Sequence, residues 1–532
     1  MKSFSAYPSR RSMVVGRGGM VATSHPLAAQ AGLQMLAQGG SAADAVIAAA
    51  AVLNVVEPMS TGIGGDAFAL VYDAKSKSVK ALNGSGRAPQ TLNREVFAQQ
   101  GLTKIPLTGV LPITVPGAVA AWDQLIRAHG KLDFATILAP AIRYARDGFA
   151  VSEIIARGWA GAEAKLRLHP DAARIYLPNG RAPRMGEVVV QAELARTFTE
   201  IAQGGAETFY RGALAERIVA NLARDGAYLS MADMAAHVSD WVTPATAKYR
   251  GYDVFECPPN GQGLTALIAL RILDGFDLAS LPVNSPASLH LQIEAMRLAF
   301  ADAARYIADP AFVDVPIDFL LSEAYIATRR ALIDPTRVGD YGAGELPISH
   351  DTVYVTAVDA EGNAVSFINS LYYGFGSGVV AGDTGICMQN RGACFVLDEG
   401  HPNVLAPGKR PYQTIIPCMV TKEGELWSSF GVMGGFMQPQ GHAQMLVNMI
   451  DYGMNPQESL DAPRYELLEP YNGDRTLALE HDDATQQALR KLGHEVVPAS
   501  VGGFGGGQII NMENNVAFGG SDPRKDGSAV GL

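Results

Sequence analysis

Residues 352–370, TVYVTAVDAEGNAVSFINS, constrain the fold most, because two runs of alternating apolar and polar residues flank a short Glu-Gly turn. This pattern predicts a β-hairpin. The residues before it, 336–351, are rich in Gly, Pro and Ser, which predicts an exposed linker. Strands and helices are predicted on both sides of that linker. We therefore expect a layered α/β structure in which the linker is a loop that could be cut, and not a boundary between two independent cores.

The remaining segments support the same class. A strand is predicted at MVATS, followed by two helices, the second with Ser41 as its N-cap and its end before Pro58. Residues 117–235 are predicted to be mostly helical, and residues 236–275 to return to strand and loop. After the linker we expect strands at PCMV and LWSSFGV, a helix near QGHAQMLVNMIDYG and a last hairpin at GQIINMENNVAFGG.

Composition excludes several classes of partner. The chain has 532 residues, a net charge of −11 and no stripe of Lys and Arg, which argues against nucleic acid. Its longest apolar run, residues 42–56, contains Asp44 and Asn54 and is too short to cross a bilayer. No apolar region follows Arg10-Arg11, as an export signal would need. We therefore expect a cytoplasmic protein that has no membrane or nucleic-acid partner.

Metal and cofactor sites are not predicted. The cysteines form no CxxC pair, and no HExxH motif is present. Free thiols are expected, as in a reducing compartment. Two cysteines, Cys387 and Cys418, are predicted to lie in the core, while Cys394 is compatible either with a small apolar filler or with a role in substrate choice. The fourth cysteine is Cys257.

Short motifs by themselves are ambiguous. GIGGDAF, GFGSG and GGFGGG lack the strand-to-helix context of a nucleotide site, and GxSxG is absent. His442, between Gln440 and Gln444, predicts a surface or core-edge histidine on a polar helix face. Gly434-Gly435, after an apolar strand, is typical either of a tight turn or of two backbone N–H groups that bind an oxyanion.

Thr352 raises a similar choice. It is a good strand residue, and that is one sufficient explanation. If the chain were cut between Asp351 and Thr352, however, the new α-amine could act as the base that activates the Thr hydroxyl. A linker before Thr352 and a strand after it suit such a self-cleaving precursor.

A resemblance that covers nearly the whole chain decides this choice. TVYVTAVDAEGNAVSFINS, GFGSGVV, APGKRP, GVMGG, DYGMNPQESLDAPR and GGSDPR resemble the γ-glutamyltransferase family, and so do the upstream segments MVATSHPLAAQAGLQMLAQGGSAADAV, GIGGDAFALVYD and NGSGRAP. Family members are N-terminal-nucleophile (Ntn) hydrolases made as single-chain proenzymes. The resemblance implies an αββα four-layer sandwich, a large chain 1–351, a small chain 352–532, and an assembly of one heterodimer or two. It implies no cofactor and no metal.

The same resemblance assigns site residues. Thr352 aligns with the nucleophile, and Ser370 stands where members carry a second Thr beside it. Gly434 and Gly435 match the oxyanion-hole pair. Arg87 matches the arginine that holds the substrate carboxylate, as a guanidinium fork can.

Departures from the family pattern concern the substrate. Cys394 replaces an acidic residue that binds the substrate α-amine, Tyr372 replaces an Asn with a similar role, and Arg391 adds positive charge. Gln413-Thr414 replaces a Ser pair, and residues 395–408 are shorter than the lid of transpeptidase-type members. These changes predict a small amide with a carboxylate and no α-amine, as in the subfamily that resembles oxamate amidohydrolase and glutathione-hydrolase-like proteins.

Three alternatives stay open. One is true γ-glutamyl hydrolysis or transfer on glutathione-like substrates. The second is an acylase for glutaryl side chains of β-lactams. The third is a non-enzymatic relative that binds a metabolite and never matures, although a dead scaffold has no chemical need to keep Thr352, Ser370, Arg87 and the glycine pair together.

Overall fold

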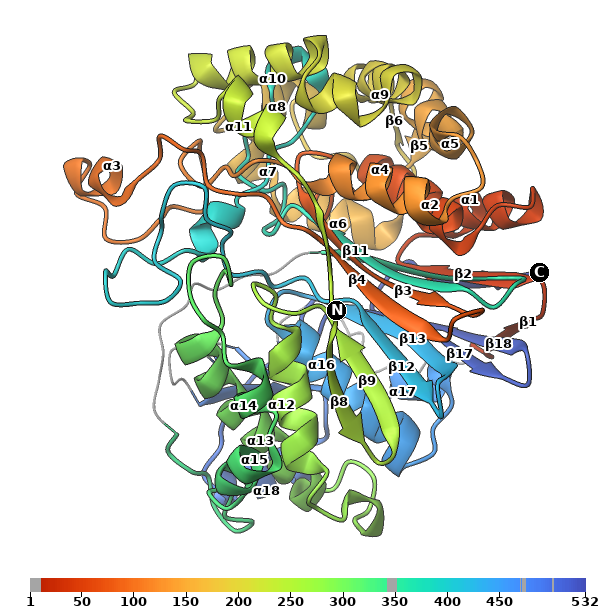
Figure 1. The fold of residues 1–532 in the computed structure, drawn as a ribbon, viewed down its shortest axis with the longest axis vertical. Helices are drawn as coiled ribbons and strands as arrows, with labels where there is room; N and C mark the ends of the chain where they lie inside the picture. Colours follow the sequence, from red (N-terminus) through yellow and green to blue (C-terminus); the bar gives the residue numbers. More distant parts are fainter. Residues whose placement is uncertain (1–10, 342–351, 469, 471–474, 500–501) are drawn as a thin grey trace.

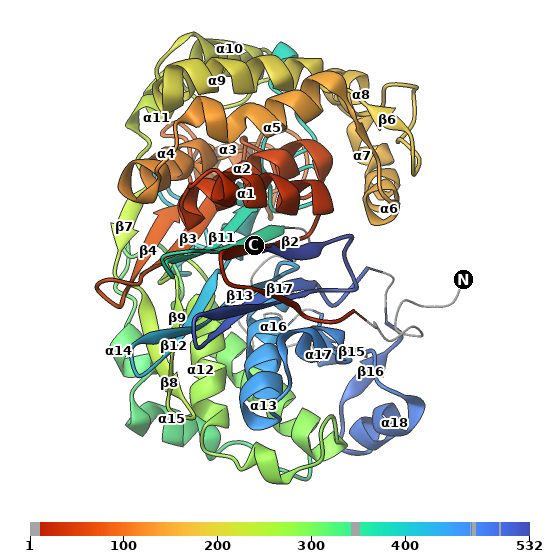
Figure 2. The same ribbon diagram turned by 90° about the vertical axis from the view of Figure 1, so that its right-hand side faces the viewer.

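A computed structural model describes residues 11–341, 352–468, 470, 475–499 and 502–532. Two sheets are stacked face to face in the middle, and helices cover the outer face of each sheet, which makes four layers (Figures 1 and 2). Apolar side chains from both sheets, among them Phe68, Ile368, Met419 and Ile510, fill the space between them. In the described part of the chain, no helix combines the length and apolar character that crossing a bilayer requires.

The first sheet has seven strands in the order β19-β2-β10-β11-β3-β4-β7, all antiparallel. Its centre is the predicted hairpin of residues 353–370, closed by a turn in which Asp359 N–H donates to Asn363 O at 3.0 Å. The strands are β2 (Gly19–Thr23), β3 (Asp66–Asp73), β4 (Ser78–Gly84), β7 (Asp240–Val242), β10 (Val353–Asp359), β11 (Ala364–Ser370) and β19 (Ser528–Gly531).

The second sheet also has seven antiparallel strands, in the order β1-β18-β17-β13-β12-β9-β8. The last predicted hairpin, residues 506–521, lies next to its centre. The strands are β1 (Val14–Gly16), β8 (Ala245–Tyr249), β9 (Tyr252–Glu256), β12 (Cys418–Lys422), β13 (Glu425–Met433), β17 (Gly506–Glu513) and β18 (Val516–Ser521).

The helices on the first sheet come from residues before position 240 (Figure 1). The most buried is α2, whose N-terminus is closed by a capping box between Ser41 and Asp44, as the sequence predicts for Ser41. The helices are α1 (Pro26–Ala37), α2 (Ala42–Val56), α4 (Ala118–His129), α5 (Phe134–Asp147), α6 (Glu153–Gly161), α7 (Glu163–Leu166), α8 (Pro170–Tyr176), α9 (Ala192–Tyr210), α10 (Ala213–Arg224) and α11 (Met231–Ala236), with a two-stranded ribbon of β5 (Phe149–Ala150) and β6 (Val188–Val189). The short helix α3 (Arg94–Gln99) buries Phe97 in the core of the other layer.

The helices on the second sheet come from both parts of the chain. Before the linker these are α12 (Gly263–Leu273), η2 (Leu278–Ser280), α13 (Pro286–Tyr306), α14 (Ile317–Leu320) and α15 (Glu323–Arg330). After it come the turn η4 (Arg391–Cys394), then α16 (Met437–Leu446), the π-helical turn η5 (Val447–Asp451), α17 (Pro456–Asp461) and α18 (Asp483–Lys491), with a small sheet of β14 (Tyr465–Leu467), β15 (Thr476–Leu479) and β16 (Glu495–Val497). The turn η3 (Gly382–Thr384) lies instead against α9 and α10 of the other helical layer.

Both large sheets mix strands from the two sides of the linker. In the first sheet β10 lies between β2 and β11, and in the second sheet β12 lies between β9 and β13. The parts before and after Thr352 therefore share one core, as the mixed pattern of strands and helices predicts. The linker itself, 336–351, is described only up to residue 341.

One predicted region is wrong. The sequence predicts only strands and loops for residues 236–275, but residues 263–273 form α12. This helix, GLTALIALRIL, is apolar on all sides, and ten of its eleven residues are buried. The sequence therefore lacks the 3.6-residue alternation that marks a helix with a solvent face.

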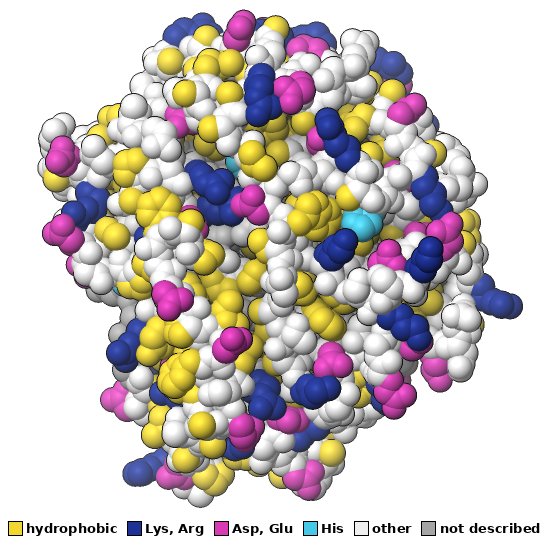
Figure 3. Space-filling model, viewed as in Figure 1, with side chains coloured by type: hydrophobic (Ala, Val, Ile, Leu, Met, Phe, Trp, Pro, Cys, Tyr) yellow, Lys and Arg dark blue, Asp and Glu magenta, His cyan; other side chains and the backbone are white. Residues whose placement is uncertain are grey.

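The surface is consistent with the charge argument. On the face drawn in Figure 3, Lys and Arg side chains alternate with Asp and Glu, and no single-sign stripe is visible.

Candidate active site

Thr352 directly precedes β10, and its side chain is buried. Its Oγ1 lies 3.3 Å from Ser370 Oγ, and Gln438 Nε2 donates to it at 3.4 Å. Ser370 ends β11, and the hairpin register, with Val353 opposite Asn369, brings the two hydroxyls together. The structure thus brings two of the predicted catalytic residues into contact. Asp351, the other side of the predicted cleavage point, lies outside the described residues.

Tyr372 connects this hydroxyl pair to a positive charge. Its backbone N–H donates to Ser370 Oγ at 2.8 Å, and its φ of 82° is one that non-glycine residues rarely adopt. Such strain persists only where surrounding contacts hold it, and it is enriched at functional sites. The buried Tyr372 ring lies under the guanidinium of Arg391, 4.3 Å from ring centroid to Cζ.

Arg391 is fully buried in the turn η4. Its Nη1 donates to Thr414 Oγ1 at 2.8 Å and is 3.9 Å from Cys394 Sγ. Its Nε and Nη2 have no hydrogen-bond partner among the described residues. Burial raises the pKa of the Cys394 thiol, so this neighbour is neutral. A buried guanidinium with free donors is suited to bind a carboxylate.

Asp66, at the start of β3, is a site residue that the sequence analysis missed. Its Oδ1 accepts from the N–H groups of Gly86 and Gly117 and from Gln389 Nε2, at 2.9, 3.2 and 2.9 Å. Its Oδ2 accepts from Gln413 Nε2 at 2.7 Å. Burial raises the pKa of Asp66 to about 6, against the opposing effects of Arg391 and these donors.

The motif that contains Asp66, GIGGDAF, has a packing role that explains its glycines. A Cβ on Gly65 would lie 2.2 Å from the Ser370 carbonyl oxygen, which is closer than any side chain can approach. Only glycine therefore allows the loop before β3 to lie against the end of β11. The signal in the sequence was the Asp that follows the glycine pair.

The adjacent residues Gln413 and Thr414 connect Asp66 to Arg391 through hydrogen bonds. Gln413 N–H donates to Asn260 O at 2.9 Å, and Thr414 O accepts from Gln262 Nε2 at 2.6 Å. These contacts fix the backbone of both residues. Gln413 donates a hydrogen bond to Asp66, and Thr414 accepts one from Arg391. The predicted pair therefore contacts one acidic and one basic side chain.

Gly434 and Gly435 follow β13, which ends at Met433, and lead into α16. Their φ values are 121° and 58°, both in the region that favours glycine. Gln262 Nε2 donates to Gly435 O at 2.8 Å, while Met437 N–H donates to Gly434 O at 3.0 Å. With both carbonyls held in this way, the glycine pair has a fixed orientation next to the helix that carries Gln438.

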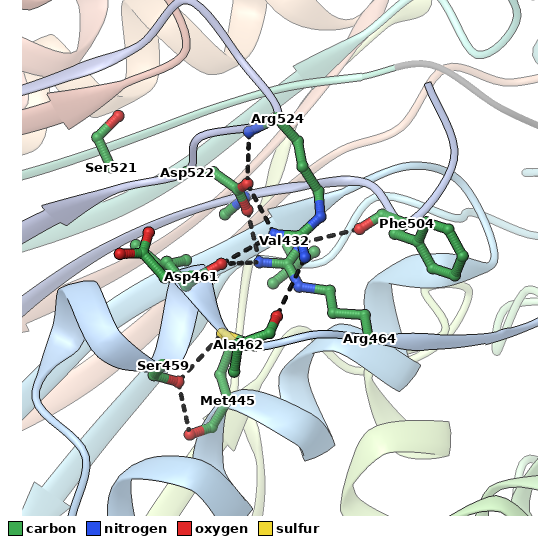
Figure 4. A network of polar contacts seen from close by, with 12 residues as sticks. Val432, Met445, Ser459, Asp461, Ala462, Arg464, Phe504, Ser521, Asp522 and Arg524 are labelled. Carbon is green, nitrogen blue, oxygen red and sulfur yellow. Dashed lines mark hydrogen bonds and ion pairs between the residues drawn. The ribbon is translucent and has the colours of Figure 1, made fainter. Parts of the chain in front are cut away.

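The segment of residues 502–507, which leads into β17, packs behind this pair. A Cβ on Gly434 would be 3.0 Å from Gly505 Cα. Arg464 holds the loop through Phe504 O at 2.7 Å and is paired with Asp522 at 2.5 Å (Figure 4). The glycine run GGFGGG therefore serves close packing in the described residues.

Arg87 has a different charged neighbour from Arg391. Its side chain is about one third exposed, and its Nη2 is 3.8 Å from Asp240 Oδ2. Burial and the neighbouring Arg410 lower the pKa of its guanidinium. Of the predicted substrate-binding residues, the structure groups Tyr372, Arg391, Cys394, Gln413 and Thr414, and it places Arg87 beside Asp240.

Two groups of potential metal ligands are present among the described residues, each with its donor atoms within 4.8 Å of one another: Glu256, Cys418 and His442, and His290, Glu294 and His494. In the second group Glu294 already accepts from Arg297, Gly339 and Tyr341. His442 is fully buried, so the prediction of a surface or core-edge histidine is wrong. All four cysteines are buried and free.

Comparison with known proteins gives a consistent result. Residues 28–532 match the family Gamma-glutamyltranspeptidase. The chain is 41% identical to a glutathione hydrolase-like proenzyme of Bacillus subtilis, over 98% of this chain and 99% of that one. It is 36% identical to an oxamate amidohydrolase proenzyme of Klebsiella pneumoniae, over 97% and 99%.

A solved structure agrees with the fold. The crystal structure of a cephalosporin acylase from Bacillus halodurans superposes with a TM-score of 0.93 at 45% identity, over 99% of this chain and 98% of that one. Fold and resemblance are thereby confirmed. The chain belongs to the gamma-glutamyltranspeptidase family and is a threonine-type Ntn hydrolase with the αββα fold.

Proposed function

We propose that the chain is cut between Asp351 and Thr352 and then hydrolyses a small amide whose acyl group carries a carboxylate and no α-amine, such as oxamate to oxalate and ammonia. The observation that carries the proposal is the buried Arg391, with two nitrogens that lack a partner among the described residues, on the ring of the tyrosine that bonds to Ser370. An amine-bearing acyl group would meet a like charge there.

The chemistry uses the residues around Thr352. The freed α-amine takes the proton of Oγ1, and Oγ1 attacks the amide carbon. The oxyanion that forms is bound by backbone N–H groups of Gly434 and Gly435. The amine or ammonia leaves with a proton from the Thr352 α-ammonium. Water then attacks the ester, assisted by the same amine, and releases the acid. Ser370 holds Oγ1 at 3.3 Å in line for these steps.

Asp66 is the acid near Arg391, and its hydrogen bonds argue against a role as an amine receptor. Both of its oxygens accept bonds from the protein, three at Oδ1 and one at Oδ2. A carboxylate offers about four acceptor positions in all. Asp66 therefore binds protein groups that form the site, and Arg391 is the charged residue with donors left for a substrate.

Arg391 and Arg87 are two candidate receptors for a substrate carboxylate. Arg391 would hold a carboxylate of the acyl group beside Thr352. Arg87, one third exposed and 3.8 Å from Asp240, would hold a carboxylate only by competing with that aspartate. By the family resemblance Arg87 would bind the substrate carboxylate, so variants of Arg87 and Arg391 must be compared in parallel.

A second candidate is a glutaryl or cephalosporin-type acylase. It is favoured by the 45% identity to the Bacillus halodurans acylase. Its acyl group satisfies the same charge requirement with a longer chain. γ-Glutamyl hydrolysis or transfer is a weaker candidate, because it needs an amine receptor in place of Cys394 and Arg391.

The two chains of the cut precursor would stay together as a heterodimer. Strands from residues 11–341 and 352–532 are hydrogen-bonded side by side in both sheets, so separating the chains would open the shared core.

The test compares rates on three substrates: oxamate by ammonia release, and glutaryl and γ-glutamyl p-nitroanilide by absorbance. We expect kcat/KM for oxamate or the glutaryl amide to exceed that for the γ-glutamyl amide by at least about tenfold, the factor that 1.4 kcal/mol gives. Preference for the γ-glutamyl amide, with stimulation by glycylglycine, would instead support a transferase. Thr352→Ala is the inactive control.

A further inference from the structure

The buried pair His442 and Glu256 supports the strand that carries the glycine pair. β12 and β13 stay paired only as far as Cys418 opposite Phe430, whereas β13 and β17 stay paired through Met433 opposite Gly506. β13 therefore extends beyond β12. There, the N–H of Val432 donates to His442 Nε2 at 3.2 Å, so an imidazole on α16 takes the place of a strand partner.

This bond shows which tautomer the ring adopts. Because Nε2 accepts the Val432 N–H, its lone pair faces the strand and the ring proton is on Nδ1. Nδ1 lies 2.6 Å from Glu256 Oε1 and donates to it. A metal between Glu256, Cys418 and His442 would need the lone pair of Nδ1, which holds the proton instead. The cluster is thus a one-directional hydrogen-bond chain from Val432 through His442 to Glu256.

The packing isolates this chain from solvent. The side chains of His442 and Glu256 are both 0% exposed. Glu256 lies opposite Cys418 in the sheet, Cys418 lies opposite Phe430, and the His442 ring is 5.1 Å from the Phe430 ring. Water therefore cannot replace a lost contact easily, and an unpaired buried N–H costs about 1–3 kcal/mol.

One helix face links this chain to the nucleophile. His442 is four residues after Gln438, so the two side chains lie on the same face of α16. Gln438 donates to Thr352 Oγ1, and its Oε1 accepts from Ile416 N–H at 2.9 Å. Helix α16 therefore contacts Thr352 through Gln438 and, one turn later, contacts β13 through His442.

We propose that His442, held in one tautomer by Glu256, is a positioning residue that sets the end of β13 so that the Gly434 and Gly435 N–H groups face the carbonyl attacked by Thr352. The inference rests on the proposed acyl transfer at Thr352, but not on any one acyl group. It predicts a loss in kcat, because the oxyanion forms only in the transition state, with KM unchanged.

The test uses His442→Phe, which keeps a ring but removes the acceptor, and His442→Gln, whose amide oxygen can accept the Val432 N–H. The matched control is Gln444→Leu, on the same helix, because Gln444 bonds to Tyr465 and not to β13. We expect His442→Phe to lower kcat by about 10- to 100-fold, part of the loss seen when an oxyanion donor is removed. His442→Gln should recover most of kcat, and Gln444→Leu should leave it within about twofold, whatever each costs in thermal stability.

Both p-nitroanilides serve as substrates, and the loss should be proportional for each one that the wild type hydrolyses. A wild type that prefers the γ-glutamyl amide overturns the proposed substrate class but leaves this test intact. A kcat for His442→Phe within about twofold of wild type, a change in KM alone, or an equal loss in Gln444→Leu would overturn the positioning role.

If His442→Phe does not fold, Glu256→Gln tests the positioning role of His442 instead. Its amide can accept from Nδ1 or donate to it, so the ring is no longer held in one tautomer. We expect kcat to fall at least about threefold with KM unchanged, and an unchanged kcat would overturn the inference.

Discussion

The guanidinium of Arg391 lies on the ring of Tyr372, with 4.3 Å between Cζ and the ring centroid, and both side chains are buried. Tyr372 in turn donates its backbone N–H to Ser370, whose hydroxyl is 3.3 Å from Thr352 Oγ1. A fixed positive charge is therefore built into the surroundings of Thr352, and we propose that it selects the acyl groups that bind there.

Replacing this charge should remove the preference for acidic acyl groups. In Arg391→Met, we expect kcat/KM for the glutaryl amide to fall by about 10- to 100-fold, because a hydrogen bond to a charged group contributes about 1.5–3 kcal/mol. The γ-glutamyl amide should lose less. Steady-state rates on both amides measure the ratio, with Arg87→Met in parallel. An unchanged ratio in Arg391→Met would contradict the assignment of Arg391.

A negative charge introduced at position 394 provides a second test of the role of Arg391. The Sγ of Cys394 is 3.9 Å from Arg391 Nη1, so the carboxylate of Cys394→Asp would pair with the guanidinium and neutralise it. We expect the glutaryl rate to fall about tenfold and the γ-glutamyl rate to rise relative to it. Cys394→Ser, neutral and similar in size, is the control and should behave like wild type. A glutaryl preference that survives Cys394→Asp would speak against Arg391 as the anion receptor.

Ser370 should matter for rate through its hydroxyl. Ser370→Ala removes a neighbour of Thr352 Oγ1 and takes the hydroxyl acceptor from the Tyr372 N–H in a buried, strained position. We expect kcat to drop by about 10- to 100-fold, an effect of about 1–3 kcal/mol. Ser370→Thr keeps the hydroxyl and should retain most activity. Full activity in Ser370→Ala, measured on the preferred amide, would exclude this role.

Asp66 should make folding stability depend on acid pH. Its pKa is raised from 3.8 to about 6 in the folded protein, so the folded state binds the proton more tightly than the unfolded state. Its contribution is present below about pH 4 and is lost as pH rises to about 6, by about 3 kcal/mol in total.

The measurement is urea unfolding of uncut Thr352→Ala protein with and without Asp66→Asn, between about pH 4 and pH 7. In Asp66→Asn the side-chain oxygen can keep the three bonds that Oδ1 accepts, and Gln413 Oε1, which has no partner among the described residues, can turn to accept from the new amide. The unfolding free energy of the protein with Asp66 should fall relative to that of Asp66→Asn as pH rises. A difference between the two that is constant with pH would contradict the raised pKa.

Arg464 is expected to be a stability residue. It pairs with Asp522, and both side chains are almost fully buried (Figure 4). Arg464→Met removes the ion-pair partner of Asp522 Oδ2, while Asp522 keeps its pair with Arg524 at 3.1 Å, so we expect the unfolding free energy to fall by about 1–3 kcal/mol. Lys77→Met, which breaks an exposed pair with Glu425, is the control and should leave the unfolding midpoint unchanged. A midpoint for Arg464→Met equal to that of the control would contradict the expectation.

Local pattern predicted much of the fold. The hairpin at residues 353–370, the Ser41 cap and the hairpin at residues 506–521 each depend on residues that are close in sequence. The order of strands in the two sheets depends on pairing between distant segments, such as β2 with β10, which no local pattern contains. Helix α12 was missed because it is buried on all sides.

The site residues Thr352 and Ser370 were assigned from the family resemblance, and the hairpin register explains why their hydroxyls meet. Asp66 was overlooked because the glycines before it were more conspicuous than the acid. His442 was misjudged because sequence cannot show that β13 extends beyond β12 and leaves a backbone N–H for the imidazole.

The most direct test of the account is the intact mass of the purified protein after incubation at neutral pH, beside Thr352→Ala and Thr352→Ser. The account predicts two species in the wild type, with the masses of residues 1–351 and 352–532, a single uncut chain in Thr352→Ala, and cleavage in Thr352→Ser, which keeps a hydroxyl. A wild-type chain that stays uncut, or a Thr352→Ala chain that is cut at the same bond, would contradict the claim that Thr352 is an N-terminal nucleophile.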